Sequence, residues 1–320
     1  QSLSTARRES DTVTILSGVF GGKTTGTPIT FVIQNSDTHS ADYEAMHSVA
    51  RPGHADYTAY CKYHGFSDPR GGGHFSGRIT AGLVAAGAVA ITALAGRGIR
   101  IGTHIKRCAC ISDRDFQNID KDIEMLAKLT FAVLDENRAE SMKEAIAAAK
   151  RDGDSVGGIL ETAVTGLPAG VGEPWFDTLE GVLSHALFSV PAVKGVEFGD
   201  GFSLAELHGS EANDSFRAEN GVIKTETNRC GGILGGISNG MPLLFRLAVK
   251  PTPSIYKTQN TVDFIKKENT ELLIHGRHDP AVIHRARVVV DSVTALVLCD
   301  QLALRFGTDY LRADDKGEDI

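Results

Sequence analysis

The sequence has 320 residues, of which 42% are hydrophobic and 23% charged, and its formal net charge is −7 at pH 7. This length and composition allow a buried core and exclude an intrinsically disordered chain, while the acidic balance argues against nucleic acid as a partner. The five cysteines are an odd number without a Cys-x-x-Cys pair, which favours a reducing, cytoplasmic compartment over disulfides or a metal site.

The first predicted elements are two strands. Residues 12–20 and 27–35 are short runs rich in β-branched residues, and the glycine-rich sequence 21–26 separates them. This pattern predicts a β-hairpin or meander with a glycine turn.

Residues 51–78 crowd four cations, three histidines and a run of three glycines into a stretch where only Asp56 and Asp68 are acidic. No apolar period of a helix or strand holds through it, so we expect a loop. Glycines let backbone N–H groups approach a ligand closely, and arginines bind carboxylate or phosphate at two points. We interpret the segment as a cradle for a small polyanion. The alternative is a solvated basic loop with turn glycines.

An uncharged stretch of eighteen residues follows between Arg78 and Arg97. Its length is close to the lower limit for crossing a bilayer. Most of its residues are Ala, Gly and Val, whose small side chains suit close packing against other helices. We therefore expect a buried alanine-rich helix at 79–95 and no membrane span.

The rest of the chain alternates between strand and helix patterns. Strands are expected at 98–106, 159–164, 193–198 and 243–250, and helices at 121–134 and 136–150. A further helix is expected to begin at Asp177, with Glu180 three residues on. The last helix is expected at 281–306, with Asp279 as its N-cap and Pro280 in its first turn.

Hairpin connections, and strands that do not alternate one-for-one with helices, predict an α+β fold with antiparallel sheets and flanking helices. Strand–helix segments before residue 150 recur after it, which hints at two pseudo-equivalent halves. Since neither a linker nor a low-complexity tract is visible, we expect residues 1–320 to form a single domain.

Several ordered motifs resemble those of chorismate synthases. They are Arg51-Pro-Gly-His-Ala-Asp-Tyr-Thr, Lys62-Tyr, Asp68-Pro-Arg-Gly-Gly-Gly, Gly172-Glu-Pro, Lys194-Gly-Val-Glu-Phe-Gly-Asp-Gly-Phe, Gly231-Gly-Ile-Leu-Gly-Gly-Ile-Ser-Asn-Gly, Lys250-Pro-Thr-Pro-Ser and Gly276-Arg-His-Asp-Pro. Together they cover nearly the whole chain. The family opens with a Gly-Glu-Ser-His-Gly loop that carries a second catalytic histidine and that these residues do not include, so the expected domain lacks its N-terminal portion.

The resemblance implies a lyase that converts 5-enolpyruvylshikimate 3-phosphate to chorismate and phosphate by 1,4-elimination, the last common step towards the aromatic amino acids. It also implies reduced FMN as a cofactor without net redox change, and a layered β-α-β sandwich-like core assembled as a homotetramer. Two alternatives stay open: a flavin-dependent oxidoreductase acting on a small anionic substrate, and a binding protein of the same pathway. Whether this chain reduces its flavin with NADPH or depends on a separate reductase also stays open.

The resemblance assigns catalytic roles to His54, as the acid that protonates the leaving phosphate, and to Asp279, as the group that helps to remove the C6 proton. A histidine suits the first role because its pKa lies near the operating pH. Arg51 and Arg78 would bind the anionic substrate. The implied FMN-binding residues are His74, Phe75, Ser76, Glu211, Ala212, Gly235, Lys250, Pro251, Thr252, Pro253, Ser254 and Arg277. The alternatives are a structural histidine at 54 and a polar turn at 250–254, and His74 stands where the family often has arginine.

Overall fold

The computed structural model describes residues 11–35, 48–66, 74–274 and 279–312. The chain forms two compact units. The first unit contains residues 1–85, 146–156 and 251–281, and the second contains residues 86–145, 157–250 and 282–320. The chain therefore enters each unit more than once.

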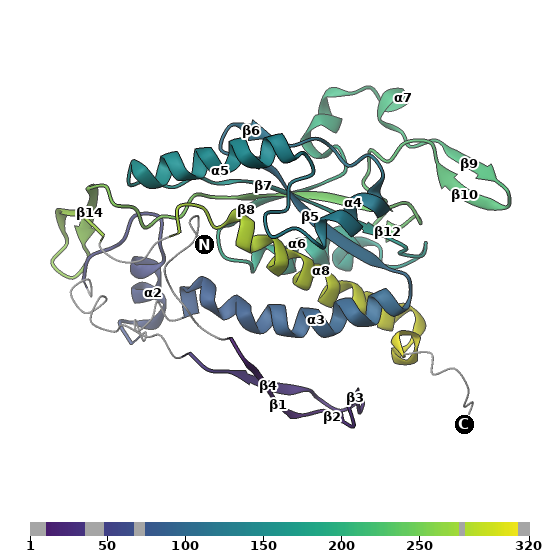
Figure 1. Ribbon diagram of the computed structural model, residues 1–320, viewed down its shortest axis with the longest axis horizontal. Helices are drawn as coiled ribbons and strands as arrows, with labels where there is room; N and C mark the ends of the chain where they lie inside the picture. Colours follow the sequence, from purple (N-terminus) through teal and green to yellow (C-terminus); the bar gives the residue numbers. More distant parts are fainter. Residues whose placement is uncertain (1–10, 36–47, 67–73, 275–278, 313–320) are drawn as a thin grey trace. The chain divides into compact units, whose positions relative to one another are not determined.

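The second unit is built on a five-stranded antiparallel sheet with the strand order β6-β5-β7-β13-β8 (Figure 1). Its strands are β5 (Arg100–Cys108), β6 (Ile111–Ser112), β7 (Gly158–Thr165), β8 (Val193–Phe198) and β13 (Leu243–Val249). In β13, Phe245 lies opposite Thr162 of β7 on one side and Phe198 of β8 on the other. The predicted α+β class with antiparallel sheets is confirmed.

Helices cover both faces of this sheet. The long helix α8 (Ile283–Phe306) contacts β5 and β7, and helix α6 (Leu179–Phe188) contacts α8. The sheet residues that point to this side are almost wholly buried and include Leu160, Phe245 and Leu247. Helix α4 (Ile119–Leu126) contacts the same two strands. It lies on the opposite face, because Gly102 meets Ile123 there and side chains alternate along a strand.

Helix α3 (Thr80–Gly96) packs on α8 through glycine. A Cβ added at Gly87 would lie only 2.1 Å from Cβ of Ser292, so no larger residue fits. However, only Gly87, Ala90 and Leu94 of this helix are buried. The expectation of a buried helix is therefore wrong: the helix has one covered face. By length and composition residues 77–96 could span a membrane, which is weak evidence because core helices of soluble proteins pass the same test.

The first unit contains two hairpins and a short helix. Strand β1 (Val13–Ser17) pairs with β4 (Thr30–Ile33), and β2 (Val19–Phe20) pairs with β3 (Lys23–Thr24), which confirms the predicted hairpin. Strand β14 (Gln259–Asp263) pairs with β15 (Glu268–Leu272). Helix α2 (Asp56–Tyr63) lies inside the segment that was expected to be a loop, so that expectation is wrong over these residues.

One backbone motif occurs in both units. In the β2–β3 hairpin, Gly18, Gly21, Gly22 and Gly26 have φ of 80°, 57°, 81° and 78°. Strands β11 (Ile233–Leu234) and β12 (Ile237–Ser238) form a second hairpin, in which Gly232, Gly235, Gly236 and Gly240 have φ of 86°, 63°, 87° and 88°. The same bond closes both, since Thr25 N donates to Gly18 O and Asn239 N to Gly232 O, each at 3.0 Å. A motif shared by the two units is compatible with pseudo-equivalent halves, which stay a prediction.

Two helices begin at residues other than those predicted. Helix α6 is capped by Thr178, whose Oγ1 accepts from Gly181 N, and Asp177 ends the preceding 3₁₀ turn. Helix α8 begins at Ile283 with Val282 as its N-cap and without a side-chain cap, so Asp279 is not the cap.

The predicted helix at 121–134 already ends at Leu126. Helix α5 (Glu136–Arg151) agrees closely with the predicted range 136–150. The remaining elements are η2 (Gly77–Ile79), η3 (Trp175–Asp177), η4 (Gly201–Glu206), α7 (Gly209–Ala212), β9 (Phe216–Glu219), β10 (Val222–Thr225) and η5 (Thr308–Leu311).

Candidate active site

Three side chains meet in the first unit where the chain turns into α2. Gly53 has φ of 71°, and His54 N donates to Arg51 O at 3.1 Å, which folds residues 51–54 into a turn. Asp56 is the first residue of α2. Its carboxylate accepts three hydrogen bonds from Arg51: from N at 2.9 Å, from Nε at 2.8 Å and from Nη2 at 2.6 Å.

The His54 ring completes this cluster. Its Nδ1 lies 3.0 Å from Nη2 of Arg51 and 3.3 Å from Oδ1 of Asp56. Burial alone would raise the pKa of Asp56, but hydrogen bonds from Arg51 and His54, with the charge of Arg51, outweigh it and hold that pKa well below its usual range. Asp56 is therefore ionised at neutral pH, and the cluster presents a histidine beside an arginine–carboxylate pair.

The residues predicted near 74–78 form a short capped turn. Ser76 caps η2, and its Oγ accepts from Arg78 N at 3.2 Å. The guanidinium of Arg78 pairs with Asp11 at 2.5 Å. His74 and Phe75 are exposed. The glycine run at 71–73 and Arg277 lie outside the described residues.

The segment 250–254 carries a buried hydroxyl that suits a ligand. Lys250 follows β13, and its backbone N donates to Ala192 O at 2.9 Å. The carbonyl of Thr252 accepts from Ser155 Oγ at 2.7 Å. The side-chain Oγ1 of Thr252 is buried and has no hydrogen-bond partner among the described residues. Ser254 is also buried. A buried polar atom without a partner is costly, so this hydroxyl fits an acceptor supplied by a bound molecule.

The other residues predicted to bind flavin lie in the second unit. Gly235 is exposed at the tip of the β11–β12 hairpin, where an added Cβ would meet nothing within 4 Å. A flat ring could therefore approach its backbone. Glu211 has a local partner: its Oε2 accepts from His208 N at 3.1 Å and caps α7, which Ala212 ends.

The structure thus brings Arg51 and His54 together, and it divides the predicted flavin residues between the two units. Those of the first unit are His74, Phe75, Ser76, Pro251, Thr252, Pro253 and Ser254, and those of the second are Glu211, Ala212, Gly235 and Lys250. Asp279 is half-buried in the first unit. The backbone beside it is held because Val156 N donates to Pro280 O at 2.9 Å.

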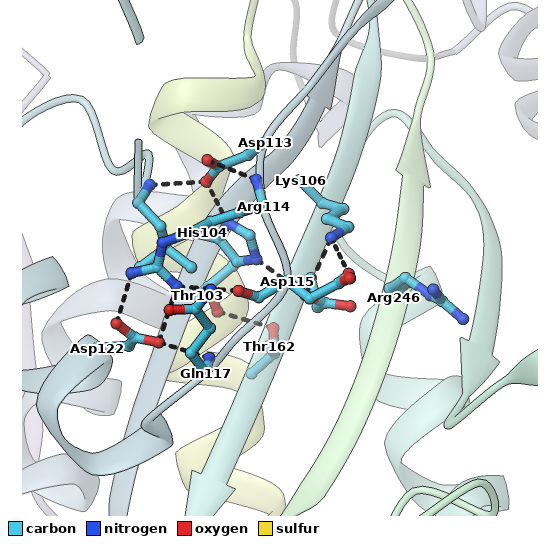
Figure 2. A network of polar contacts seen from close by, with 12 residues as sticks. Thr103, His104, Lys106, Asp113, Arg114, Asp115, Gln117, Asp122, Thr162 and Arg246 are labelled. Atoms are coloured by element: carbon cyan, nitrogen blue, oxygen red, sulfur yellow. Dashed lines mark hydrogen bonds and ion pairs between the residues drawn. The ribbon is translucent and has the colours of Figure 1, made fainter. Parts of the chain in front are cut away.

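Sequence reasoning missed the contacts of Asp56 with Arg51 and His54, because it noted Asp56 only as an acid among cations. The spacing Arg-x-x-His-x-Asp at the start of a helix was the available signal. It also passed over His104, whose Nδ1 lies 2.7 Å from Oδ2 of Asp113 (Figure 2). Its Nε2 lies 2.9 Å from Oε2 of Glu161. This network lies in the sheet of the second unit and contains none of the predicted site residues. Within the described ranges, no cluster of His, Cys, Asp and Glu is arranged to hold a metal ion.

Comparisons with known proteins agree with one another. The sequence pattern of the chorismate synthase family matches residues 1–303. A chorismate synthase of Thermococcus gammatolerans is 48% identical over 302 residues, which are 94% of this chain and 84% of that protein. One of Methanosarcina acetivorans is 48% identical over 305 residues, which are 95% of this chain and 83% of that protein. A chorismate synthase crystal structure superposes with a TM-score of 0.73 at 29% identity, covering 94% of this chain and 81% of that chain.

Proposed function

The chain belongs to the chorismate synthase family, and we propose that His54 is the general acid of its reaction. It is a carbon–oxygen lyase that converts 5-enolpyruvylshikimate 3-phosphate to chorismate and phosphate. The observation that carries the assignment of His54 is its contact with both Arg51 and Asp56 at the start of α2.

The cluster suits proton donation to a leaving phosphate. Because the Nδ1 side of the His54 ring faces Arg51 and Asp56, Nε2 is the atom assigned to give the proton. Arg51 and Arg78 supply positive charge for a substrate with one phosphate and two carboxylates. Asp279 is assigned to help remove the C6 proton, and the half-buried position of this residue is compatible with that role.

The family uses reduced flavin, and we assign FMN to this chain. Thr252 and Ser254 would hold the phosphate tail together with Lys250, and the buried Oγ1 of Thr252 supports this assignment. The backbone of Gly235 would lie against the ring. When bound, reduced FMN supplies electron density for the loss of phosphate. NADPH is the proposed source of reducing equivalents, either on this chain or through a reductase.

The substrate is a small molecule, and the assembly we propose is a homotetramer. Support comes from helix α3, which is apolar along its length although only three of its residues are buried within one chain. Contiguous exposed apolar surface of this kind is usually covered by a partner. All five cysteines are free thiols, which fits the proposed cytoplasmic location.

An anaerobic assay tests the function. The purified protein, given 5-enolpyruvylshikimate 3-phosphate and chemically reduced FMN, should release phosphate and form chorismate while the flavin absorbance stays that of the reduced form. Stoichiometric oxidation of the flavin with substrate would instead support the oxidoreductase alternative. Tight substrate binding without any release of phosphate would support the binding-protein alternative.

A further inference from the structure

The contact geometry at His54 provides for two protonation states of one ring nitrogen. Arg51 Nη2, a donor, lies 3.0 Å from Nδ1, and Asp56 Oδ1, an acceptor, lies 3.3 Å from the same atom. A bare Nδ1 accepts from the guanidinium, whereas a protonated Nδ1 donates to the carboxylate. Each form of the imidazole therefore has a suitable partner near Nδ1: Arg51 at 3.0 Å or Asp56 at 3.3 Å.

The two neighbours have opposite electrostatic effects on the ring. The charge of Arg51 disfavours an imidazolium, and the charge of Asp56 favours it. Asp56 also binds Arg51 at two guanidinium nitrogens and at its backbone N, which fixes the cation and offsets part of its effect on the ring. Without the carboxylate, an unbalanced cation would lie 3.0 Å from the ring.

Other charged groups near this cluster are engaged elsewhere. The β14–β15 hairpin packs against α2 through Phe264, whose ring contacts Tyr57 and Tyr60. Its charged residues at that end are Asp263, Lys266, Lys267 and Glu268. Nζ of Lys266 lies 3.7 Å from Oδ2 of Asp263, which also accepts from Ser48 Oγ. The titratable side chains that follow Asp56 on and just after α2 are Tyr57, Tyr60, Cys61, Lys62, Tyr63 and His64. Among the described residues, Arg51 and Asp56 are the charged groups that contact His54.

We propose that Asp56 is a positioning residue for the elimination. It holds Arg51 in place and keeps His54 able to carry the proton that the leaving phosphate receives. The proposal rests on the assignment of His54 as the general acid. Asp56 acts through Arg51 and His54 and does not contact the substrate.

The test is the Asp56→Asn variant, which keeps the size of the side chain and removes its charge. We expect its kcat near neutral pH to fall by about 10- to 100-fold, part of what general acid catalysis contributes. The alkaline limb of its kcat–pH profile should move to lower pH, because Arg51 then opposes protonation of His54. The double variant Arg51→Gln/Asp56→Asn removes the opposing cation as well, so its alkaline limb should move back while KM rises. The proposal would be overturned in favour of a structural role if Asp56→Asn lowered kcat by the same factor at every pH and melted early.

A second readout needs no turnover. In protein labelled with ¹³C at histidine Cε1, the His54 signal is identified by its absence from the His54→Ala variant. Its pH titration should move to lower pH in Asp56→Asn and back in the double variant. If that movement occurs while His54→Ala retains full turnover, the general-acid assignment fails and the electrostatic role of Asp56 stands. If His54→Ala is inactive and the titration does not move, the general-acid assignment stands and this proposal fails.

Discussion

His104 and Asp113 form an ion pair whose two side chains are both 0% exposed, with 2.7 Å between Nδ1 and Oδ2. On its other side, the His104 ring faces Glu161 across the β5–β7 strand pair. Asp113 also accepts from Leu134 N at 2.7 Å, so it ties the segment after α4 to the sheet. His104, held between two carboxylates, thus joins two strands and one connecting segment.

This network makes the stability of the second unit depend on pH. Burial lowers the pKa of His104, but the hydrogen bonds to Asp113 and Glu161 outweigh it, and the net pKa lies above 6.5. The stabilisation is therefore fully present below about pH 6.5 and is lost as pH rises through the folded-state pKa. Urea unfolding at several pH values should show this loss of stability. In His104→Gln, the free energy of unfolding should depend less on pH in this alkaline range. An unchanged slope in the variant would show that other groups cause it.

Replacing Asp113 should lower the free energy of unfolding more than deprotonation of His104 does. Asp113→Asn leaves the charge of His104 with Glu161 alone and weakens the contact with Leu134 N. We expect the free energy of unfolding to fall by about 3–5 kcal/mol, as for other broken buried pairs. Lys143→Ala, which breaks the exposed pair between Lys143 and Glu140, is the matched control and should cost about 0–1 kcal/mol. Similar losses for both variants would contradict the buried, charged state of the network.

A buried carboxyl group on α8 predicts a stabilising substitution. Burial raises the pKa of Asp291 to about 6, although Arg287 and a hydrogen bond from Thr103 Oγ1 at 2.5 Å lower it in part. Its ionised form therefore destabilises the fold increasingly as pH rises above the unfolded value of 3.8. Asp291→Asn keeps an acceptor for Thr103 and should raise the free energy of unfolding by up to about 3 kcal/mol near pH 8, with little effect near pH 4. Melting curves at both pH values decide this, and equal shifts would exclude the electrostatic cause.

The strands and long helices were predictable because their signals are local. Alternation of apolar residues located β5, β7, β8 and β13 to within two residues of their observed bounds. The eight-residue helix α2 was missed because its sequence, Asp-Tyr-Thr-Ala-Tyr-Cys-Lys-Tyr, carries no clear apolar stripe. The cap of α8 was misplaced because the Asp279–Pro280 pair is typical of a helix start, whereas the helix begins only at Ile283.

The polar clusters were harder to predict because they depend on register and turn geometry. His104 and Glu161 are 57 positions apart, and only the pairing of β5 with β7 sets them opposite one another. Asp56 reaches Arg51 and His54 because the turn at Gly53 has positive φ. Residue types alone identified His54 and Arg51 as candidates, but the resemblance to a family, rather than spacing, supplied their roles.

His54→Ala separates a catalytic histidine from a structural one. We expect turnover to fall by about 10²–10⁴-fold, because the proton donor is lost while Arg51 and Asp56 still hold each other. Binding of FMN and substrate should change little, and the melting temperature should be retained. His64→Ala, at the exposed end of α2, is the control for a histidine substitution in the same segment. Loss of binding and early melting in His54→Ala would support the structural alternative.

Lys250→Ala tests the phosphate end of the FMN site. A lost charge-assisted hydrogen bond should weaken FMN binding by about 1.5–3 kcal/mol, measured by fluorescence titration. Thr252→Val removes the buried Oγ1 while it keeps the shape of the side chain. It should weaken FMN binding without destabilising the free protein, because the hydroxyl has no partner among the described residues. Titration curves like those of the wild type in both variants would remove the segment 250–254 from the site.

Asp279 gives the sharpest separation of catalysis from folding. Helix α8 begins at Ile283 with Val282 as its N-cap. Because asparagine keeps the size and one acceptor oxygen of the side chain, Asp279→Asn should leave the melting temperature nearly unchanged. If the carboxylate helps to remove the C6 proton, the amide cannot replace it, and turnover should fall by about 10²-fold or more, near 2.7 kcal/mol of barrier. A substrate deuterated at C6 should then show a larger isotope effect in the variant, because proton removal becomes slower relative to the other steps. Normal turnover of Asp279→Asn with reduced FMN would remove Asp279 from the chemistry.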